Sequence, residues 1–243
     1  MSQVIWSKLL IPDLQSTPSS LKDPYYQDEV LNVLPFSEAS DQISIPDQRA
    51  FRSMSRASIF LSHICQAAEE ILKPFLTTSP FSVGIYCAVE NGPIDAASTQ
   101  KIIQQNNAIL FSDYYRKFRN PKMYLKQLPN LVPAQMGISL GIQGAMNVYT
   151  HSTAGSLQAL EQAEWDLKNK TVTAALVCTA HAFDDFMVVK RERHFDSRCL
   201  TEAAGAILLK QNNEFTDWSQ KIKKDPKHFF GISDTIVNCI RSI

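Results

Sequence analysis

The sequence is organised around residues 137–160, which read GISLGIQGAMNVYTHSTAGSLQAL. An apolar helix end leads into a turn bounded by Gly141 and Gly144, and a short apolar run and a group of hydroxyl and small residues follow. From Leu157 on, apolar residues recur at helical spacing. A strand, a tight turn and a helix in this order hold a side chain at a helix N-terminus, where free N–H groups favour negative charge. An ordinary strand–helix joint with serine or threonine caps gives the same pattern.

Continuous apolar runs of strand length predict a sheet that is buried on both faces. They lie at Phe81–Ala88 and Thr171–Cys178, and a further strand is expected at Ile207–Lys210. Residues 95–118 read as helix. Strands and helices therefore alternate along the chain, which indicates an α/β fold.

The first part of the chain has a different composition. Residues 1–46 are rich in proline, serine and aspartate, and predict a short strand near 3–11 followed by long loops. A helix is expected over 48–73, where apolar and small residues recur at helical spacing, and Pro74 should end it.

Composition limits the classes of function. The 243 residues are 44% hydrophobic and 20% charged, which is enough for one sizeable core, so we expect residues 1–243 to form a single domain. Lys+Arg and Asp+Glu both total 24, so no basic field favours nucleic acid. No apolar run approaches the roughly 20 residues that span a bilayer. The N-terminus does not read as a signal peptide, so a cytoplasmic location is expected. The five cysteines and five histidines lack metal-ligand spacing, so neither a metal nor a cofactor is expected.

Several segments, in order, resemble the β-ketoacyl synthases, enzymes of the thiolase fold. Gly141–Ala145 is similar to the family's G-x-x-G-P turn, and Thr150–Gly155 is similar to its T-A-C-[ST]-[ST]-G elbow. Other resembling segments lie at 52–56, 120–144, 195–209 and 231–234. In the first of these, Arg52 and Arg56 fit the family's R-R-M-[SD]-R run, but could equally be two solvated helix charges one turn apart. The resemblance extends from about residue 44 to the end.

The resemblance implies one thiolase-like layered α/β/α half, with a mixed five-stranded sheet and helices on both faces. The family's fold has two such halves, so the chain is expected to be the N-terminal half and truncated relative to a full ketosynthase. Glu202 falls on the acidic residue of the family's GEGAG segment and is expected to be a structural hydrogen-bond acceptor. The other expected structural residues are Gly141, Gly144, Gly155 and Gly205.

The family's nucleophilic cysteine position falls on Ser152. Carrying an acyl chain for condensation needs a thiolate, which forms readily at a helix N-terminus. A serine hydroxyl needs a positioned general base instead. His151 is adjacent, but neighbours on a strand point to opposite faces, so it is a weak candidate. The family's catalytic histidines belong to its second half. We therefore assign no catalytic residue, and do not expect the chain to be catalytic by itself.

The resemblance also implies an interface. In the family, the region after Pro121 lies between two subunits, and a side chain just after the proline lines the partner's acyl pocket. The short apolar run at 145–149 would pair with its counterpart across a two-fold axis. The expected interface and acyl-tunnel residues are Met123, Tyr124, Ala145, Met146, Asn147, Val148 and Tyr149.

Three functions remain open. The first is a chain-length factor, a ketosynthase-like subunit of aryl-polyene, polyketide or fatty-acid-type biosynthesis. It would form a heterodimer with a full-length β-ketoacyl-ACP synthase, shape its acyl tunnel and meet the acyl carrier protein indirectly. The second is an acyltransferase or hydrolase that uses Ser152 on carrier-protein thioesters, with His151 or His181 as the base. The third is a homo-oligomeric binding protein without chemistry.

Overall fold

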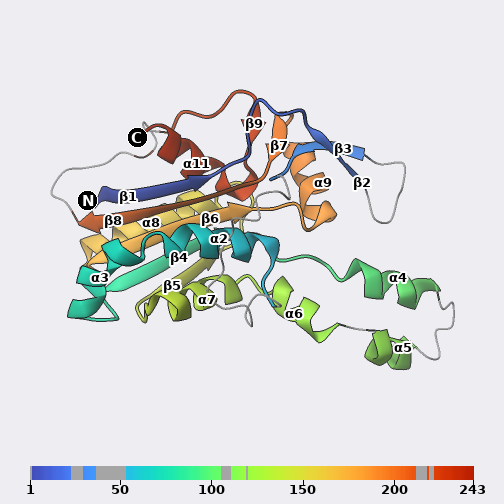
Figure 1. Cartoon of the computed structure of the whole chain (residues 1–243), viewed down its shortest axis with the longest axis horizontal. Coiled ribbons are helices and arrows are strands. Elements are labelled where there is room, and N and C mark those ends of the chain that lie inside the picture. The colour runs from blue at the N-terminus through green and yellow to red at the C-terminus, as the bar shows by residue number, and fades with distance from the viewer. Residues whose placement is uncertain are drawn as a thin grey trace.

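A mixed five-stranded sheet lies at the centre of the computed structural model, which describes residues 2–22, 30–36, 53–104, 111–118, 120–211, 218 and 222–243 (Figure 1). The strand order is β1-β8-β6-β4-β5. β4 pairs in parallel with β5 and with β6, whereas β8 pairs antiparallel with β6 and β1. The strands are β1 (Ser2–Leu10), β4 (Val83–Val89), β5 (Met146–Tyr149), β6 (Ala174–His181) and β8 (Ala203–Gln211).

Helices cover both faces of this sheet, so every side chain of the central strands β4 and β6 is buried. On β4, Ile85 and Cys87 face one hydrophobic core, whereas Tyr86 and Ala88 face another. Helices on the two faces supply the rest of each core. The predicted mixed five-stranded sheet between two helical layers is confirmed. One layer holds α2 (Arg56–Gln66), α3 (Glu69–Thr78) and α7 (Leu131–Leu140), and the other holds α8 (Gly155–Lys168) and α11 (Asp234–Arg241).

A second, four-stranded sheet has the order β2-β3-β7-β9. It packs on α9 (Phe186–Phe195), where Val189 joins Val33, Leu200 and Phe229 in a small core. The prediction of long loops after the first strand is therefore wrong for residues 19–22 and 30–34, which form β2 and β3, and β3 pairs with the distant β7. The strands are β2 (Ser19–Lys22), β3 (Val30–Leu34), β7 (Cys199–Thr201) and β9 (His228–Phe229), and a short 3₁₀ helix, η2 (Gly231–Ser233), precedes α11.

The helix expected over 48–73 differs from the observed one. Residues 48–52, including Arg52, lie outside the described residues, and α2 begins at Arg56, where the Ser55 hydroxyl accepts from the Ser58 N–H as an N-cap. A break at 67–68 separates α2 from α3. Pro74 lies inside α3 and does not end it.

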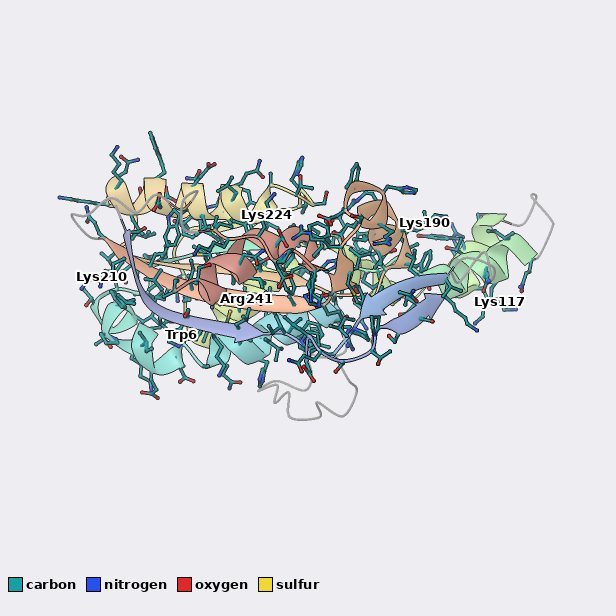
Figure 2. All side chains as sticks on the ribbon, turned by 90° about the horizontal axis from the view of Figure 1, so that it is seen from above. Trp6, Lys117, Lys190, Lys210, Lys224 and Arg241 are labelled. Atoms are coloured by element: carbon teal, nitrogen blue, oxygen red, sulfur yellow. The ribbon has the colours of Figure 1, made fainter. Side chains whose placement is uncertain are left out.

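A helical arm projects from the body beyond α7 (Figure 1). It contains α4 (Ala96–Gln104), α5 (Phe111–Phe118) and α6 (Pro121–Gln127), so the single predicted helix at 95–118 is two helices in the described residues. Lys117, on α5, lies at this far end of the molecule (Figure 2).

Candidate functional site

Two glycines shape the turn that leads into β5. Gly141 ends α7 in the left-handed conformation, with φ 73°, which glycine adopts without a steric penalty. A Cβ on Gly144 would lie 2.1 Å from the Val83 carbonyl oxygen, so only glycine lets the turn pass this close to β4. Gly155 begins α8 and Gly205 lies inside β8, each against isoleucine side chains from the last part of the chain.

The elbow places Ser152 in a turn just before α8, half-buried. The Nδ1 atom of His151 accepts from the backbone N–H of Ala154 at 3.2 Å and of Thr153 at 3.4 Å. His151 thus satisfies backbone N–H groups of the turn that leads into α8. Because Nδ1 accepts these hydrogen bonds, its lone pair is not available for a serine proton. No hydrogen bond joins Ser152 Oγ to any residue that the structure describes.

Acidic and basic side chains gather where the parallel strands end. Because β4, β5 and β6 run in parallel, their carboxyl ends share one edge, where ligands of open α/β sheets bind. Glu90 follows β4 directly, and His181 is the last residue of β6. Glu90 accepts from Arg191 of α9 at 2.8 Å, and lies within electrostatic reach of His151. Burial raises the pKa of Glu90, and Arg191 and His151 oppose this.

A fully buried pair lies behind this edge. His181 Nε2 is 3.1 Å from Glu192 Oε2, and both side chains are buried. Burial raises the pKa of Glu192 to about 8, with the Glu90 charge adding to the effect. Burial likewise lowers the pKa of His181 to about 3, and the Arg191 charge contributes. Both groups are therefore neutral near pH 7. Neither ring nitrogen of His181 and neither carboxyl oxygen of Glu192 has a hydrogen-bond partner among the described residues. His181 is consequently enclosed rather than open to the elbow.

This pair gives the fold a specific pH dependence. Between about pH 3 and 4.5 the low pKa of His181 makes stability rise with pH, because the unfolded state binds more protons. Between pH 4.5 and 6.5 the opposite effect of Glu192 cancels this. From pH 6.5 to 8 mainly Glu192 releases a proton on unfolding, so we expect a net loss of about 1 kcal/mol. Urea titrations across this range should show the loss in the native chain and not in Glu192→Gln. An equal loss in the variant would contradict the assignment.

Glu202 is completely buried and connects three separate segments. Its Oε1 accepts from Arg56 Nε at 2.7 Å and from the Phe183 N–H at 2.8 Å. Its Oε2 accepts from Arg56 Nη2 and from the Phe36 N–H, each at 2.8 Å. Four donors thus satisfy the carboxylate, in a bidentate geometry with the guanidinium. The alternative of a solvated charge is wrong for Arg56.

β5 is the edge strand on its side of the central sheet, since only β4 pairs with it among the described strands. Met146 of β5 is 39% exposed, and its side chain lies over Gly137 of α7. Ile138, also on α7, is 85% exposed. An open edge flanked by exposed apolar side chains is a surface where another chain can pair.

The expected interface residues fall into two groups. Residues 145–149 lie together along β5 and the turn before it, half-buried or exposed. Met123 and Tyr124 lie on α6, in the helical arm (Figure 1), with Met123 half-buried and Tyr124 63% exposed. α6 begins where the Asn120 side chain accepts from the Lys122 N–H, with a proline at its start.

Comparisons with known proteins identify the fold. No protein-family model matches the sequence, and no curated protein matches it. Solved structures do match: the chain has the thiolase-like fold of ketosynthases.

Three of these structures illustrate the shared fold. The ketosynthase ApeO in complex with its chain length factor ApeC, from Xenorhabdus doucetiae, matches with a TM-score of 0.58 and 10% identity over 88% of this chain and 58% of that chain. The ishigamide ketosynthase/chain length factor matches with a TM-score of 0.53 and 15% identity, over 85% of this chain and 55% of that chain. The AntDE:AntF structure is a type II PKS acyl-carrier protein in complex with its ketosynthase. It matches with a TM-score of 0.57 and 15% identity, over 74% of this chain and 53% of that chain. The chain therefore spans slightly more than half the length of these structures.

The sequence analysis missed Glu90, Arg191 and Glu192. One signal for Glu192 was available, because it recurs at helical spacing with the buried Phe186 and Val189 on α9. A charged residue in the apolar phase of a helix indicates a buried partner. Glu90 and Arg191 are 101 residues apart in the sequence, so no local sequence pattern predicts their contact.

Proposed function

We propose that the chain is a non-catalytic ketosynthase-like subunit with the role of a chain-length factor. It pairs with a full-length β-ketoacyl-ACP synthase and shapes that enzyme's acyl tunnel. The acyl carrier protein binds the complex through the ketosynthase rather than through this chain. The pathway class we propose is aryl-polyene, polyketide or fatty-acid-type biosynthesis. The fold supports the proposal, as do the two ketosynthase and chain-length-factor structures that share it.

The observation that carries the proposal is the open edge at β5. The outer backbone groups of Met146–Tyr149 need partners, and the described residues provide none. Exposed Met146 and Ile138 flank that edge and supply apolar area that a partner can cover. We propose that the corresponding strand of the ketosynthase pairs with β5, which would extend the central sheet across the interface.

The elbow supports a role without chemistry. Ser152 lacks the acidity of a thiol, and His151 Nδ1 already accepts from the Ala154 N–H in the turn before α8. His181 is enclosed with Glu192. In this arrangement neither histidine is placed to take a proton from the serine hydroxyl, so the arrangement disfavours the Ser152 acyltransferase or hydrolase.

Co-purification tests the proposal directly. The chain is expressed alone and with the ketosynthase from its own gene neighbourhood, and the mass of each product is measured. A stable one-to-one complex is expected, with the single chain aggregated or poorly soluble because its apolar edge is uncovered. A well-behaved homodimer that ignores the ketosynthase would overturn the proposal in favour of a homo-oligomeric binding protein.

Ser152→Ala separates the subunit from the acyltransferase. If the chain is a structural partner, the complex should retain its rate of product formation to within roughly twofold, because the replacement is small and at the surface of the turn. Incubation with acyl-carrier-protein thioesters followed by intact mass should show no acyl adduct on the native chain. An adduct that disappears in Ser152→Ala would favour the alternative.

Replacements of Met123 test the tunnel. Met123→Ala removes side-chain volume where we propose that the acyl chain ends, so products should lengthen by roughly one extension unit. Met123→Trp adds volume and should shorten them. Product lengths are read by mass spectrometry of the reconstituted complex. Lys122→Ala, an exposed neighbour on the same helix, is the control and should change nothing. Unchanged products with every Met123 variant would remove this residue from the tunnel.

A further inference from the structure

Little apolar surface holds α9 against the rest of the molecule. The helix follows β6 and lies beyond the carboxyl end of that strand (Figure 1). Its buried residues are Phe186, Val189 and Glu192, so it buries only two apolar side chains. α8 buries four, at Ala159, Leu160, Ala163 and Leu167. A helix with few buried apolar contacts can open locally without unfolding of the whole domain.

The polar contact beneath α9 is unsatisfied. Glu192 lies against His181 at the end of β6, and the two side chains bury four nitrogen and oxygen atoms that have no hydrogen-bond partner among the described residues. The closed helix therefore removes these atoms from water without replacing their hydrogen bonds. A void of about 10 Å³ lies nearby, between Asp185 and Val188 on one side and the ends of β4 and β6 on the other. It is close to the space that one water molecule needs, so the packing under α9 is incomplete.

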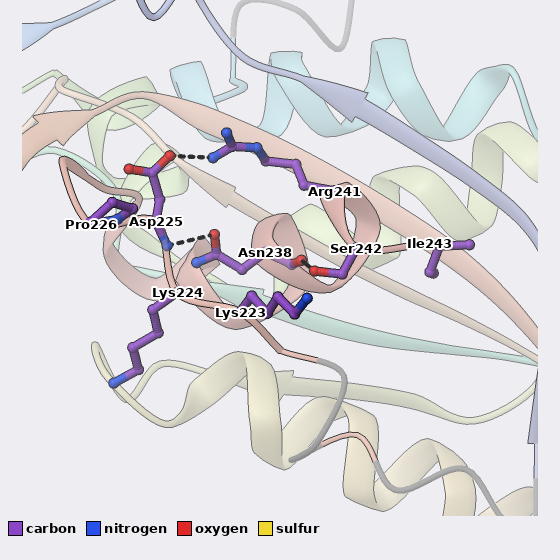
Figure 3. A pocket seen from close by; sticks show the side chains of 8 residues that line it. All are labelled: Lys223, Lys224, Asp225, Pro226, Asn238, Arg241, Ser242 and Ile243. Carbon is purple, nitrogen blue, oxygen red and sulfur yellow. Dashed lines mark hydrogen bonds and ion pairs between the residues drawn. The ribbon is translucent and has the colours of Figure 1, made fainter.

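The second sheet is attached to the body by contacts that do not involve α9. Asp225 accepts from the His228 N–H at the start of β9 and pairs with Arg241 of α11. The Asp225 N–H donates to Asn238, also on α11 (Figure 3). Arg198, which precedes β7, donates to the carbonyl oxygens of Asp225 and His228. The sheet can therefore stay in place when α9 moves.

We infer that α9 is a lid over the carboxyl ends of β4 and β6 that opens locally, and that ionisation of Glu192 favours the open state. Opening gives water to His181 and Glu192 and separates Arg191 from Glu90. It also uncovers the edge at which ligands of open α/β sheets bind. The inference does not depend on the proposed function.

The charges around Glu192 give the direction of the pH effect. The groups that face it are His181 on β6, Glu90 after β4, and Arg191 on α9 itself. Burial and the Glu90 charge raise the pKa of Glu192 to about 8 in the closed state, and Arg191 opposes this. In the open state the pKa returns toward the ordinary 4.5, so opening releases a proton and becomes more favourable as pH rises to 8. His181, with a pKa that burial lowers to about 3, takes up a proton on opening below pH 6.5 and opposes the trend there.

Hydrogen–deuterium exchange of the full chain, or of its co-purified complex if the chain needs a partner, tests the lid. At pH 6.5 the amides of α9 should be at least roughly tenfold less protected than those of α8. Low urea should leave α9 protection unchanged, because local opening exposes little surface. Between pH 6.5 and 8, after correction for the intrinsic exchange rate, α9 protection should fall roughly eightfold.

Two results would overturn the lid. Equal protection and equal urea dependence in α9 and α8 would show that α9 opens only when the whole domain unfolds. Equal protection of α9, β3 and β7 would show that the helix and the second sheet move as one unit.

Variants test the role of Glu192. Glu192→Gln keeps the shape but cannot ionise, so its α9 protection should agree to within about twofold between pH 6.5 and 8. Glu161→Gln changes an exposed carboxylate on α8 and should keep the native eightfold fall. Thermal melts at pH 6.5 report the folding of both variants. An eightfold fall that persists in Glu192→Gln, or its absence from the native chain, would overturn the role of Glu192.

Discussion

Replacing Glu202 with alanine should lower the free energy of unfolding by about 3–5 kcal/mol, the usual result of breaking a buried ion pair from one side. The change leaves the Arg56 guanidinium and the N–H groups of Phe36 and Phe183 without their acceptor. Because these donors come from the N-terminal segment, the start of α2 and the loop after β6, all three segments should loosen together. Urea denaturation of the single chain, or of its complex if the chain needs a partner, measures the loss.

Matched variants identify the cause of that loss. Glu202→Gln keeps the shape and two acceptor lone pairs but not the charge, so its loss should be smaller than that of alanine. Glu70→Ala removes a carboxylate from an exposed pair with Lys73 and should change stability by less than about 1 kcal/mol. A Glu202→Ala variant as stable as Glu70→Ala would show that the buried network contributes little.

Met146→Asp should weaken binding of the ketosynthase by about 100-fold or more. The carboxylate would be enclosed in the proposed interface without a partner, and each factor of ten corresponds to about 1.4 kcal/mol. Met146 is 39% exposed in the single chain, so the fold should tolerate the change. Affinity is measured by surface-immobilised titration of purified components, or by the yield of the co-purified complex.

Met187→Asp is the control for this experiment. Met187 is 46% exposed on α9, away from β5, and the same replacement there should leave the affinity unchanged. Equal weakening by both variants would indicate a general loss of folding. Unchanged affinity with Met146→Asp would exclude β5 as the contact.

The sequence predicted the parts of the fold that follow from local pattern. The apolar runs become β4 and β6 because strands buried on both faces need apolar side chains at every position. The elbow prediction depended on glycines whose roles are also local, such as the left-handed Gly141. Pro74 was expected to end the helix, but it lies inside α3. A proline removes one backbone hydrogen bond from a helix and crowds the preceding turn, and the packing of α3 on the sheet offsets this cost.

The charged contacts could not be read in the same way. Arg56 meets Glu202 across 146 residues, and the spacing of arginines on a helix says nothing about a partner that far along the chain. His151 is a candidate base by its position next to Ser152, yet its Nδ1 atom accepts from the backbone N–H of Ala154 in the turn before α8. Residues of the elbow are therefore located by sequence, while their hydrogen-bonding roles depend on the tertiary structure.

The pairing of β1 with β8 has a consequence for synthesis of the chain. Ser2 lies opposite Gln211, so about 200 residues of synthesis separate β1 from β8, its partner among the described strands. At typical elongation rates the apolar side chains of β1 wait about 10–40 s for that partner. During this interval, nascent chains expose a strand of high β-propensity, and holding chaperones should bind the N-terminal segment before any later one.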